Sequence, residues 1–211
     1  GDRTDFGWRL SAAACYGAGA GWDSLRAETL GVAAALGDLA PAGRGLRLAP
    51  RWMALRQPIE FRARVPQAAA GKRLGLYVRG SGDWELLSTE RDSSGAWWIA
   101  HPTHLGDFSF FEDRVAPRIT ALSPPHLRGS AALYSRWALE ARLAEQGSGV
   151  SARASGFMVD GRKRPTEWDA VDRKLRWKPR TPPAAGTHHY VVVAVDRAGN
   201  ERRVSGTFVI N

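Results

Sequence analysis

The sequence predicts an all-β fold made of two consecutive antiparallel β-sandwiches, and three observations support this prediction. Apolar and polar side chains alternate strictly over residues 59–65, as expected for a strand with one buried face. The valine-rich run at residues 190–195 is followed by Asp196, Gly199 and Asn200, residue types that end strands and form tight turns. Similar turn signals recur about every ten residues, a spacing typical of β-sandwiches.

The chain of 211 residues is long enough for one large domain or two small ones. Its hydrophobic content of 44% and aromatic content of 9% can fill a core, which argues against global disorder. A short segment around Pro117 separates two stretches that are rich in strand signals, and the proline stiffens it. We therefore expect one domain over residues 1–115 and a second over residues 116–211.

The sequence shows no pattern for a membrane-spanning helix, a signal peptide or an intramolecular disulfide. No apolar run reaches the roughly 18 residues that a membrane-spanning helix needs, so we expect no membrane span. The first residues lack the apolar segment of a signal peptide. The single cysteine, Cys15, has no partner for an intramolecular disulfide, and we expect it to be a small, partly buried apolar residue.

The formal net charge of +9 and the isoelectric point near 10.5 raise the question of nucleic-acid binding. Only four of the 30 basic residues are lysines, and the arginines are scattered along the chain. The densest basic run, residues 162–164, lies in an expected hairpin loop. The pattern therefore indicates a solvated basic surface with weak affinity for anions rather than a nucleic-acid interface.

The N-terminal half contains a series of short strand signals. Residues 31–45 are interrupted by Gly and Pro, so we expect a loop there, with a short helical turn at residues 32–36 as the alternative. We expect strands at residues 5–10, 22–30, from Leu46 to Pro50, and at 59–65, 74–78, 84–87, 96–100 and 105–111, with a polar turn at 91–95.

The C-terminal half has the same organisation. Residues 131–143 are ambiguous, because their apolar side chains fit both a helical and an alternating spacing. A hairpin turn is expected at residues 160–165 and a turn at 196–200 followed by a polar segment. We expect strands at residues 119–122, 152–159, 167–169, 175–177, 190–195 and 207–210.

Motifs in the C-terminal half resemble a known family. Val159-Asp160-Gly161, Leu175-Arg176-Trp177 and the run from Ala194 to Asn200 look like the immunoglobulin-like modules of large secreted bacterial proteins. This resemblance covers roughly residues 116–211 and implies a strand at 131–143, core positions for Trp168 and Trp177, and a structural role for His188. Glu145 stands where the loop of that family usually has Asp.

The N-terminal half resembles ZU5-like modules of bacterial surface and secreted proteins. The resemblance rests on Leu76-Tyr77, on the run from Trp84 to Leu87 and on the run from Leu105 to Asp113. A ZU5-like module followed by an immunoglobulin-like module implies the C-terminal region of a larger protein, in some cases with an upstream zinc peptidase domain of the lysostaphin type. It also implies a secreted, periplasmic or cell-surface location, with the other domains of the parent protein as partners.

We searched the histidines and acidic residues for metal-ligand spacing. His101, His104 and Asp107 would group on a helix, but Pro102 and the strand context disfavour one. His188 and His189 are adjacent, so they point to opposite faces of a strand and cannot bind the same ion in that geometry.

Four oxygen-bearing side chains are the candidates for a calcium site. Calcium needs several oxygen ligands, and these residues lie in loops that could meet at one end of a sandwich. The alternative is that Asp196 and Asn200 bond the backbone of their own turn. The four candidates are Glu145, Asp160, Asp196 and Asn200.

The nine tryptophans suggest a possible carbohydrate-binding surface, because exposed aromatic rings can stack on sugars. Trp97 and Trp98 are adjacent, so one of them must face out of its strand. Trp22 and Trp52 lie near turns. These four residues are the candidate ligand-binding residues, and inter-domain or core packing is the alternative role.

No motif for nucleophilic catalysis, a phosphate-binding loop or a zinc peptidase occurs in the sequence. We therefore expect a non-catalytic accessory module that acts as a spacer, in adhesion or in bringing a parent enzyme to its substrate. A carbohydrate- or cell-wall-binding module is one alternative. A self-assembling subunit is another, in which an unpaired terminal strand at residues 6–10 or 207–210 joins a neighbouring copy.

Overall fold

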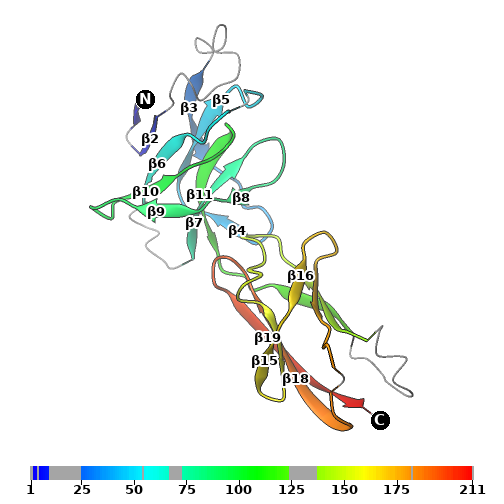
Figure 1. Cartoon of the computed structure of the whole chain (residues 1–211). Coiled ribbons are helices and arrows are strands. Elements are labelled where there is room, and N and C mark those ends of the chain that lie inside the picture. Colours follow the sequence, from blue (N-terminus) through cyan, green and yellow to red (C-terminus); the bar gives the residue numbers. More distant parts are fainter. Residues whose placement is uncertain are drawn as a thin grey trace. The chain divides into compact units, whose positions relative to one another are not determined.

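The computed structural model describes residues 2–3, 5–9, 25–53, 55–66, 73–123, 137–181 and 183–210. The chain divides into two compact units, Gly1–Arg114 and Val115–Asn211, which we call the N-terminal and C-terminal units (Figure 1). The expected boundary, between residues 115 and 116, lies one residue beyond this division.

The fold is all-β. The part of the chain that the structure describes contains antiparallel strands, turns and bends but no helix. No helix that could cross a membrane is found in these residues. The predicted fold class is therefore confirmed at the level of an all-β protein with several antiparallel sheets.

The N-terminal unit contains two sheets. The first has the order β1-β2-β6-β10-β9 and the second the order β3-β5-β11-β7-β8, with β4 paired to β11. The first sheet is built from β1 (Asp2–Arg3), β2 (Phe6–Arg9), β6 (Glu60–Arg64), β9 (Thr89–Arg91) and β10 (Trp97–Ala100). The second is built from β3 (Arg26–Val32), β4 (Leu39–Pro41), β5 (Arg44–Ala49), β7 (Leu74–Arg79), β8 (Glu85–Leu86) and β11 (Asp107–Asp113).

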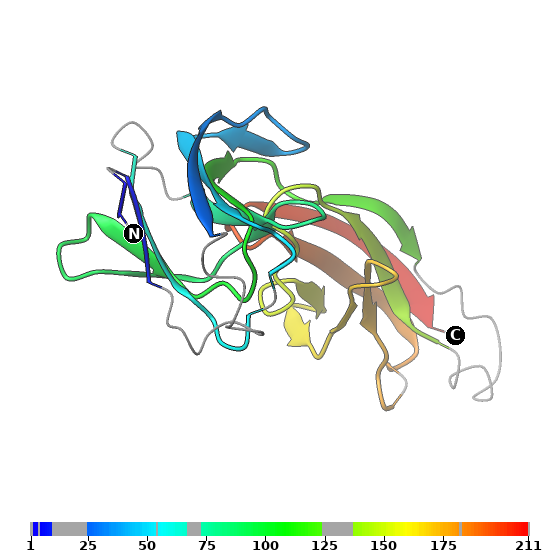
Figure 2. The same ribbon diagram turned by 90° about the horizontal axis from the view of Figure 1, so that it is seen from above.

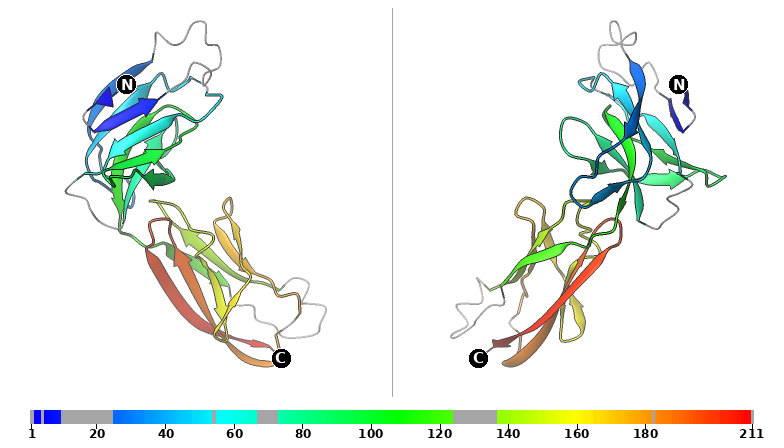
Figure 3. Two further views of the ribbon diagram at one scale, coloured as in Figure 1. Left: turned by 60° about the vertical axis from the view of Figure 1, so that its left-hand side comes forward. Right: turned by 180° about the vertical axis from the view of Figure 1, so that it is seen from behind.

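The core of the N-terminal unit lies between these two sheets (Figure 3). Phe61 of the first sheet stacks on Phe108 of the second, with ring centroids 4.0 Å apart. Successive side chains of a strand point to opposite faces of the sheet, so the residues between the core residues lie on the outer face. On β11, Phe108 and Phe110 enter the core, so Asp107, Ser109 and Phe111 face away from it.

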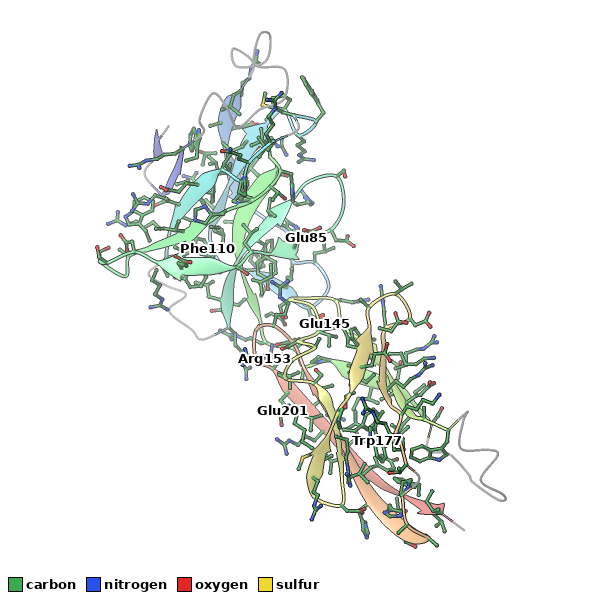
Figure 4. All side chains as sticks on the ribbon, viewed as in Figure 1. Glu85, Phe110, Glu145, Arg153, Trp177 and Glu201 are labelled. Carbon is green, nitrogen blue, oxygen red and sulfur yellow. The ribbon has the colours of Figure 1, made fainter. Side chains whose placement is uncertain are left out.

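A smaller apolar cluster covers part of this second face of β11. It consists of Leu39, Tyr77, Trp84 and Phe111, and the Trp84 and Phe111 rings meet edge to face at 4.8 Å. The six-stranded sheet is therefore buried on both faces along part of its width. Figure 4 shows Phe110 inside the N-terminal unit.

The C-terminal unit is formed by two four-stranded sheets, ordered β12-β13-β17-β16 and β15-β14-β18-β19. Seen from above, β18 and β19 run as a long pair that ends at the C-terminus (Figure 2). The first sheet contains β12 (Arg118–Ser123), β13 (Leu139–Ala144), β16 (Glu167–Asp169) and β17 (Lys174–Trp177). The second contains β14 (Gly156–Val159), β15 (Arg162–Arg164), β18 (Gly186–Val195) and β19 (Glu201–Ile210).

Inward-facing residues of both sheets fill the core of the C-terminal unit. Trp137 is its centre, because its ring meets Trp177 at 5.3 Å and Phe208 at 5.5 Å. Tyr190, Val192 and Ala194 alternate inward along β18. Each unit thus has a sandwich-like arrangement of two sheets around its own core.

Several expected loops proved to be strands. Residues 31–45 are not the single loop that we expected: β3 continues to Val32, and β4 and the start of β5 follow. The alternative, a short helical turn at residues 32–36, is also absent: Leu36 and Leu39 exchange two backbone hydrogen bonds and close a tight turn. The burial of Leu39 against the second face of β11 is a tertiary effect that the local sequence does not reveal.

Other boundaries moved for similar reasons. The hairpin turn expected at residues 160–165 is limited to Asp160 and Gly161, both with positive φ, and β15 follows at once. The polar residues after the turn at 196–200 belong to β19, whose pairing with β18 begins at Glu201. Residues 152–154 form a turn instead of the expected strand, and residues 89–91 form β9. The strand expected at 131–143 is confirmed for its second part, β13, whereas residues 131–136 lie outside the described residues.

The two terminal strands differ in position. β2 lies between β1 and β6, so the expected strand at residues 6–10 is not the edge of its sheet. β19, which contains residues 207–210, is the last strand of its sheet. The expected strand at 22–30 is observed from Arg26, and Trp22 and Cys15 lie outside the described residues.

Candidate binding surfaces

Three arginines converge on one buried carboxylate in the N-terminal unit. Asp107 is fully buried, with 0% of its side chain exposed. Arg47 donates to its two oxygens from Nε (2.7 Å) and Nη2 (3.3 Å). Arg79 donates from Nη2 at 3.0 Å, and Arg51 donates from Nη2 to the same oxygen. We call these four residues the arginine–aspartate cluster.

Sheet register explains why these residues meet. Asp107 on β11 pairs with Arg47 on β5 and with Arg79 on β7, and Arg47 pairs in turn with Glu28 on β3. Charges of alternating sign therefore form one row across four strands, on the face opposite the core. Opposite charges on directly paired residues stabilise a sheet.

The environment of Asp107 has opposing effects on its acidity. Burial alone would raise the pKa of the Asp107 carboxyl, but the hydrogen bonds from Arg47, Arg51 and Arg79 outweigh it and lower the pKa to about 2. Asp107 is thus an anion at neutral pH and holds the three guanidinium groups in place.

A pocket of about 340 Å³ opens beside the arginine–aspartate cluster. Arg47, Arg79 and Asp107 lie along one side of it, and Ser109 and Gly45 line it further along the sheet. The Trp84 ring and the segment 30–36 supply apolar walls. The Arg79 guanidinium lies 4.9 Å from the centre of the Trp84 ring, so cation and aromatic wall are in contact.

A second surface is the outer face of the five-stranded sheet, around Trp97. Trp98 points inward and meets Phe110 of the core, so Trp97 points outward. The guanidinium carbons of Arg62 and Arg64 lie 5.5 and 6.0 Å from the centre of the Trp97 ring. The expectation that one of the two adjacent tryptophans faces out of its strand is therefore confirmed.

The remaining candidate tryptophans are placed differently. Trp52 is 78% exposed in the loop that joins β5 and β6, next to Arg51 of the arginine–aspartate cluster. Trp98 is half-buried on the core side of β10. Trp22 lies outside the described residues. Of the described candidates, Trp52 is thus the most exposed, and Trp97 is the one whose ring lies on the outer face of its sheet.

Three of the four candidate calcium ligands gather at one end of the C-terminal unit. Oxygens of Glu145 and Asp196 lie within 4.8 Å of each other. Asp196 accepts hydrogen bonds from the backbone nitrogen of Asn200 (2.7 Å) and from its Nδ2 (2.6 Å). Glu145 accepts from the backbone nitrogens of Gly147 and Gly149. These bonds hold the loops together, which is the alternative role that the sequence allowed.

Asp160, the fourth candidate, lies at the opposite end of β18. It accepts from the backbone nitrogen of His189, near the start of that strand, whereas Asp196 follows its last residue. His189 and Asp196 are seven positions apart along the chain, or about 23 Å at the usual rise per strand residue. The four residues therefore do not come together as one site.

Asp160 instead pairs with His188. The two ring nitrogens of His188 face acceptors: Nδ1 lies 2.7 Å from Asp160 Oδ2, and Nε2 lies 2.8 Å from the carbonyl oxygen of Ala184. Only the doubly protonated ring can donate to both. The Ala184 and Asp160 bonds accordingly raise the pKa of His188, and the His188 bond lowers the pKa of Asp160.

The sequence predicted some of these residues but not their chemistry. From the sequence, Asp107 was considered only as a metal ligand together with His101 and His104. In the structure its described partners are three arginines. The arginines lie 28 to 60 positions away along the chain, and no local pattern links them. Alternation on β11 was the one available signal, because it placed Asp107 and Ser109 on the same face of a strand.

Comparison with known proteins gave no relatives. No known protein family matches the sequence, and no curated protein is significantly similar to it.

Proposed function

We propose that the chain is a non-catalytic accessory region of a larger secreted or surface-displayed bacterial protein, and that it binds a cell-surface or cell-wall glycan. The observation that carries this proposal is the outward-facing Trp97, with the guanidinium groups of Arg62 and Arg64 beside its ring. In this proposal the N-terminal unit binds the glycan and thereby keeps the parent protein at its site of action.

Sheet topology supports an immunoglobulin-like identity for the C-terminal unit. Its strands follow the order β12-β13-β17-β16 in one sheet and β15-β14-β18-β19 in the other. Numbered along the chain, this is the ABED and C′CFG arrangement of immunoglobulin-like sandwiches. The ZU5-like identity of the N-terminal unit rests on sequence resemblance, and its clearest motif, residues 105–113, includes β11 at the centre of the six-stranded sheet.

The Trp97 face favours a sugar ligand over a nucleic acid because two of its arginines are matched by acidic side chains. Arg9 lies 3.9 Å from Glu60, and Arg62 lies 3.6 Å from Asp92. A nucleic-acid interface would instead present an excess of cations. Acidic and basic side chains around one aromatic ring offer both acceptors and donors to sugar hydroxyls, while the ring stacks on the sugar.

Co-sedimentation of the purified chain with peptidoglycan and with chitin tests the proposal. Trp97→Ala should weaken binding to the recognised polymer roughly tenfold, equivalent to a loss of about 1.4 kcal/mol. Because Trp97 lies on the outer face, its replacement should leave the protein folded, which thermal denaturation checks. Trp52→Ala is the matched control, since it removes an exposed tryptophan from elsewhere in the same unit.

The outcomes are distinct. Loss of binding in Trp97→Ala with retention in Trp52→Ala supports the proposal. Equal binding by the two variants and the unmodified chain overturns the role of the Trp97 face. Stronger retention on single-stranded RNA or DNA than on either polysaccharide would overturn the glycan class itself.

A further inference from the structure

The pocket beside the arginine–aspartate cluster exists because two small residues lie next to each other on the outer face of the six-stranded sheet. A Cβ atom built on Gly45 would lie 3.5 Å from the Cβ of Ser109 and 2.7 Å from the carbonyl oxygen of Phe108. No larger side chain can stand at Gly45 without moving that backbone. Larger groups surround this floor, among them Arg47, Arg79 and the Trp84 ring.

Two polar atoms of residues that line the pocket have no hydrogen-bond partner among the described residues. They are the hydroxyl oxygen of Ser109, a residue that is only 1% exposed, and Nε of Arg79. A buried polar atom left without a partner costs about 1–3 kcal/mol. Native proteins keep few such atoms, and both of these belong to residues that line the same pocket.

The charge on the pocket wall favours an anion. Arg47 and Arg79 line the pocket with two positive charges against the one negative charge of Asp107, and Arg51, outside the lining, also pairs with that carboxylate. Glu28 approaches Arg47 at 3.6 Å but is two-thirds exposed, so water screens it. Asp107 also fixes the guanidinium groups in advance, which lowers the entropy that a bound anion would have to remove.

The rest of the pocket is apolar and small. A volume of about 340 Å³ lies at the lower end of the range for small-molecule sites. Trp84, Leu30 and Leu36 line it together with three alanines. A ligand that fits therefore combines one anionic group with a compact ring or branched body.

We propose that this pocket binds a small organic anion, with its carboxylate or phosphate group between Arg79, Arg47 and Ser109 and its body against Trp84. The site is on the other sheet from Trp97 and does not depend on glycan binding. A free metabolite and the acidic end group of a surface polymer share this chemistry, and the probes below separate them.

Isothermal titration calorimetry of the full chain is the first test, with four probes at equal ionic strength. Benzoate represents a free aromatic acid, glucuronate a sugar acid, inorganic phosphate the bare anion, and benzyl alcohol the neutral isostere. At least one anionic probe should bind at least tenfold more tightly than benzyl alcohol. A preference for glucuronate over benzoate would identify a saccharide end group, and the reverse a free acid.

Two variants locate the site, and a third serves as the control. Arg79→Gln should weaken binding about tenfold, and Ser109→Ala a few-fold, because each removes one unpaired donor. Arg9→Gln, which removes the same charge from the other sheet, should leave binding unchanged. If Arg79→Gln does not fold, Ser109→Ala still tests the site, because the serine substitution removes only a hydroxyl group.

Amide chemical shifts on addition of the best anionic probe give an independent reading. Changes should concentrate at Gly45, Ser109 and residues 30–36. Equal binding of benzyl alcohol and the anions would overturn the proposal, as would undetectable binding of all probes. Shift changes confined to other residues would overturn it as well.

Discussion

Asp107 is an acidic residue buried in a protein with a large excess of positive charge. Its carboxylate has no contact with water, and three arginines share its two oxygens. Removing one partner from a buried ion network costs far more than the network contributes when intact, because the remaining charges lose their compensation. Asp107 therefore matters most through the three guanidinium groups that it keeps together.

Replacing the carboxylate by its neutral isostere should destabilise the N-terminal unit. Asp107→Asn removes the one carboxylate that the three arginine side chains share, and we expect a loss of about 3 kcal/mol in the free energy of unfolding. Urea denaturation measures it. Asp83→Asn, at an exposed site in the same unit, should change stability by less than about 0.5 kcal/mol. A similar small change in Asp107→Asn would contradict this account.

The same carboxylate makes stability depend on pH. Its pKa in the folded protein is about 2, against an ordinary value of 3.8, so the unfolded chain takes up the proton first as pH falls. The contribution of Asp107 is complete above pH 3.8 and disappears progressively as pH falls towards 2. Asp107→Asn should lack this part of the acid slope in denaturation curves between pH 4 and 2, and an unchanged slope would exclude Asp107 as its source.

In the β18–β19 hairpin, the packing depends on one cross-strand pair, Tyr190 and Gly206. Tyr190 pairs with Gly206, and its ring lies so close that a Cβ at residue 206 would overlap the hydroxyl end of the ring. Burial also raises the pKa of Tyr190. The glycine thus makes room for an aromatic side chain that belongs to the core.

Filling this space should destabilise the C-terminal unit. Gly206→Val would displace the Tyr190 ring, and we expect a loss of about 1–3 kcal/mol despite the better strand propensity of valine. Ser205→Val, at the exposed neighbouring position, introduces the same residue without the overlap and should be neutral or slightly stabilising. Chemical denaturation of both variants checks the difference, and equal effects would rule out the overlap as the cause.

A strand could be predicted when its own few residues contained a clear pattern of alternating or β-branched side chains. The strands β6, β7 and β18 carry their alternation or valine content within a few residues and were predicted. β4 and β9 have three residues each, so their own sequences contain too little pattern to reveal them. β4 is held by the distant strand β11 and β9 by its neighbour β10. The pocket was not predictable for the same reason, since its floor and walls come from β3, β5, β7 and β11.

For the whole molecule, the important feature is that each unit has its own core. Trp137 and Phe208 belong to the C-terminal core, and Phe61 and Phe108 to the N-terminal one. A β-sandwich of about 100 residues with a complete core can fold alone. The segment of residues 115–211 should therefore fold when it is expressed by itself.

Circular dichroism and thermal denaturation of the isolated segment test this prediction. We expect a cooperative transition at the temperature of the corresponding transition in the full chain. Asp107→Asn, made in the full chain, should lower the transition of the N-terminal unit and leave the other in place. An isolated segment without cooperative unfolding would contradict the independence of its core.

The way the chain enters and leaves the C-terminal unit determines how that unit would respond to tension. β12 enters beside Ala144 and the Glu145–Asp196 loops, whereas Ile210 pairs with Gly186 at the other end of β18. A pull on both ends is therefore directed along the strands and slides β19 against β18. The ten residue pairs between these strands then resist the force together and do not open one after another. A domain with this geometry can transmit tension between its two ends while it stays folded.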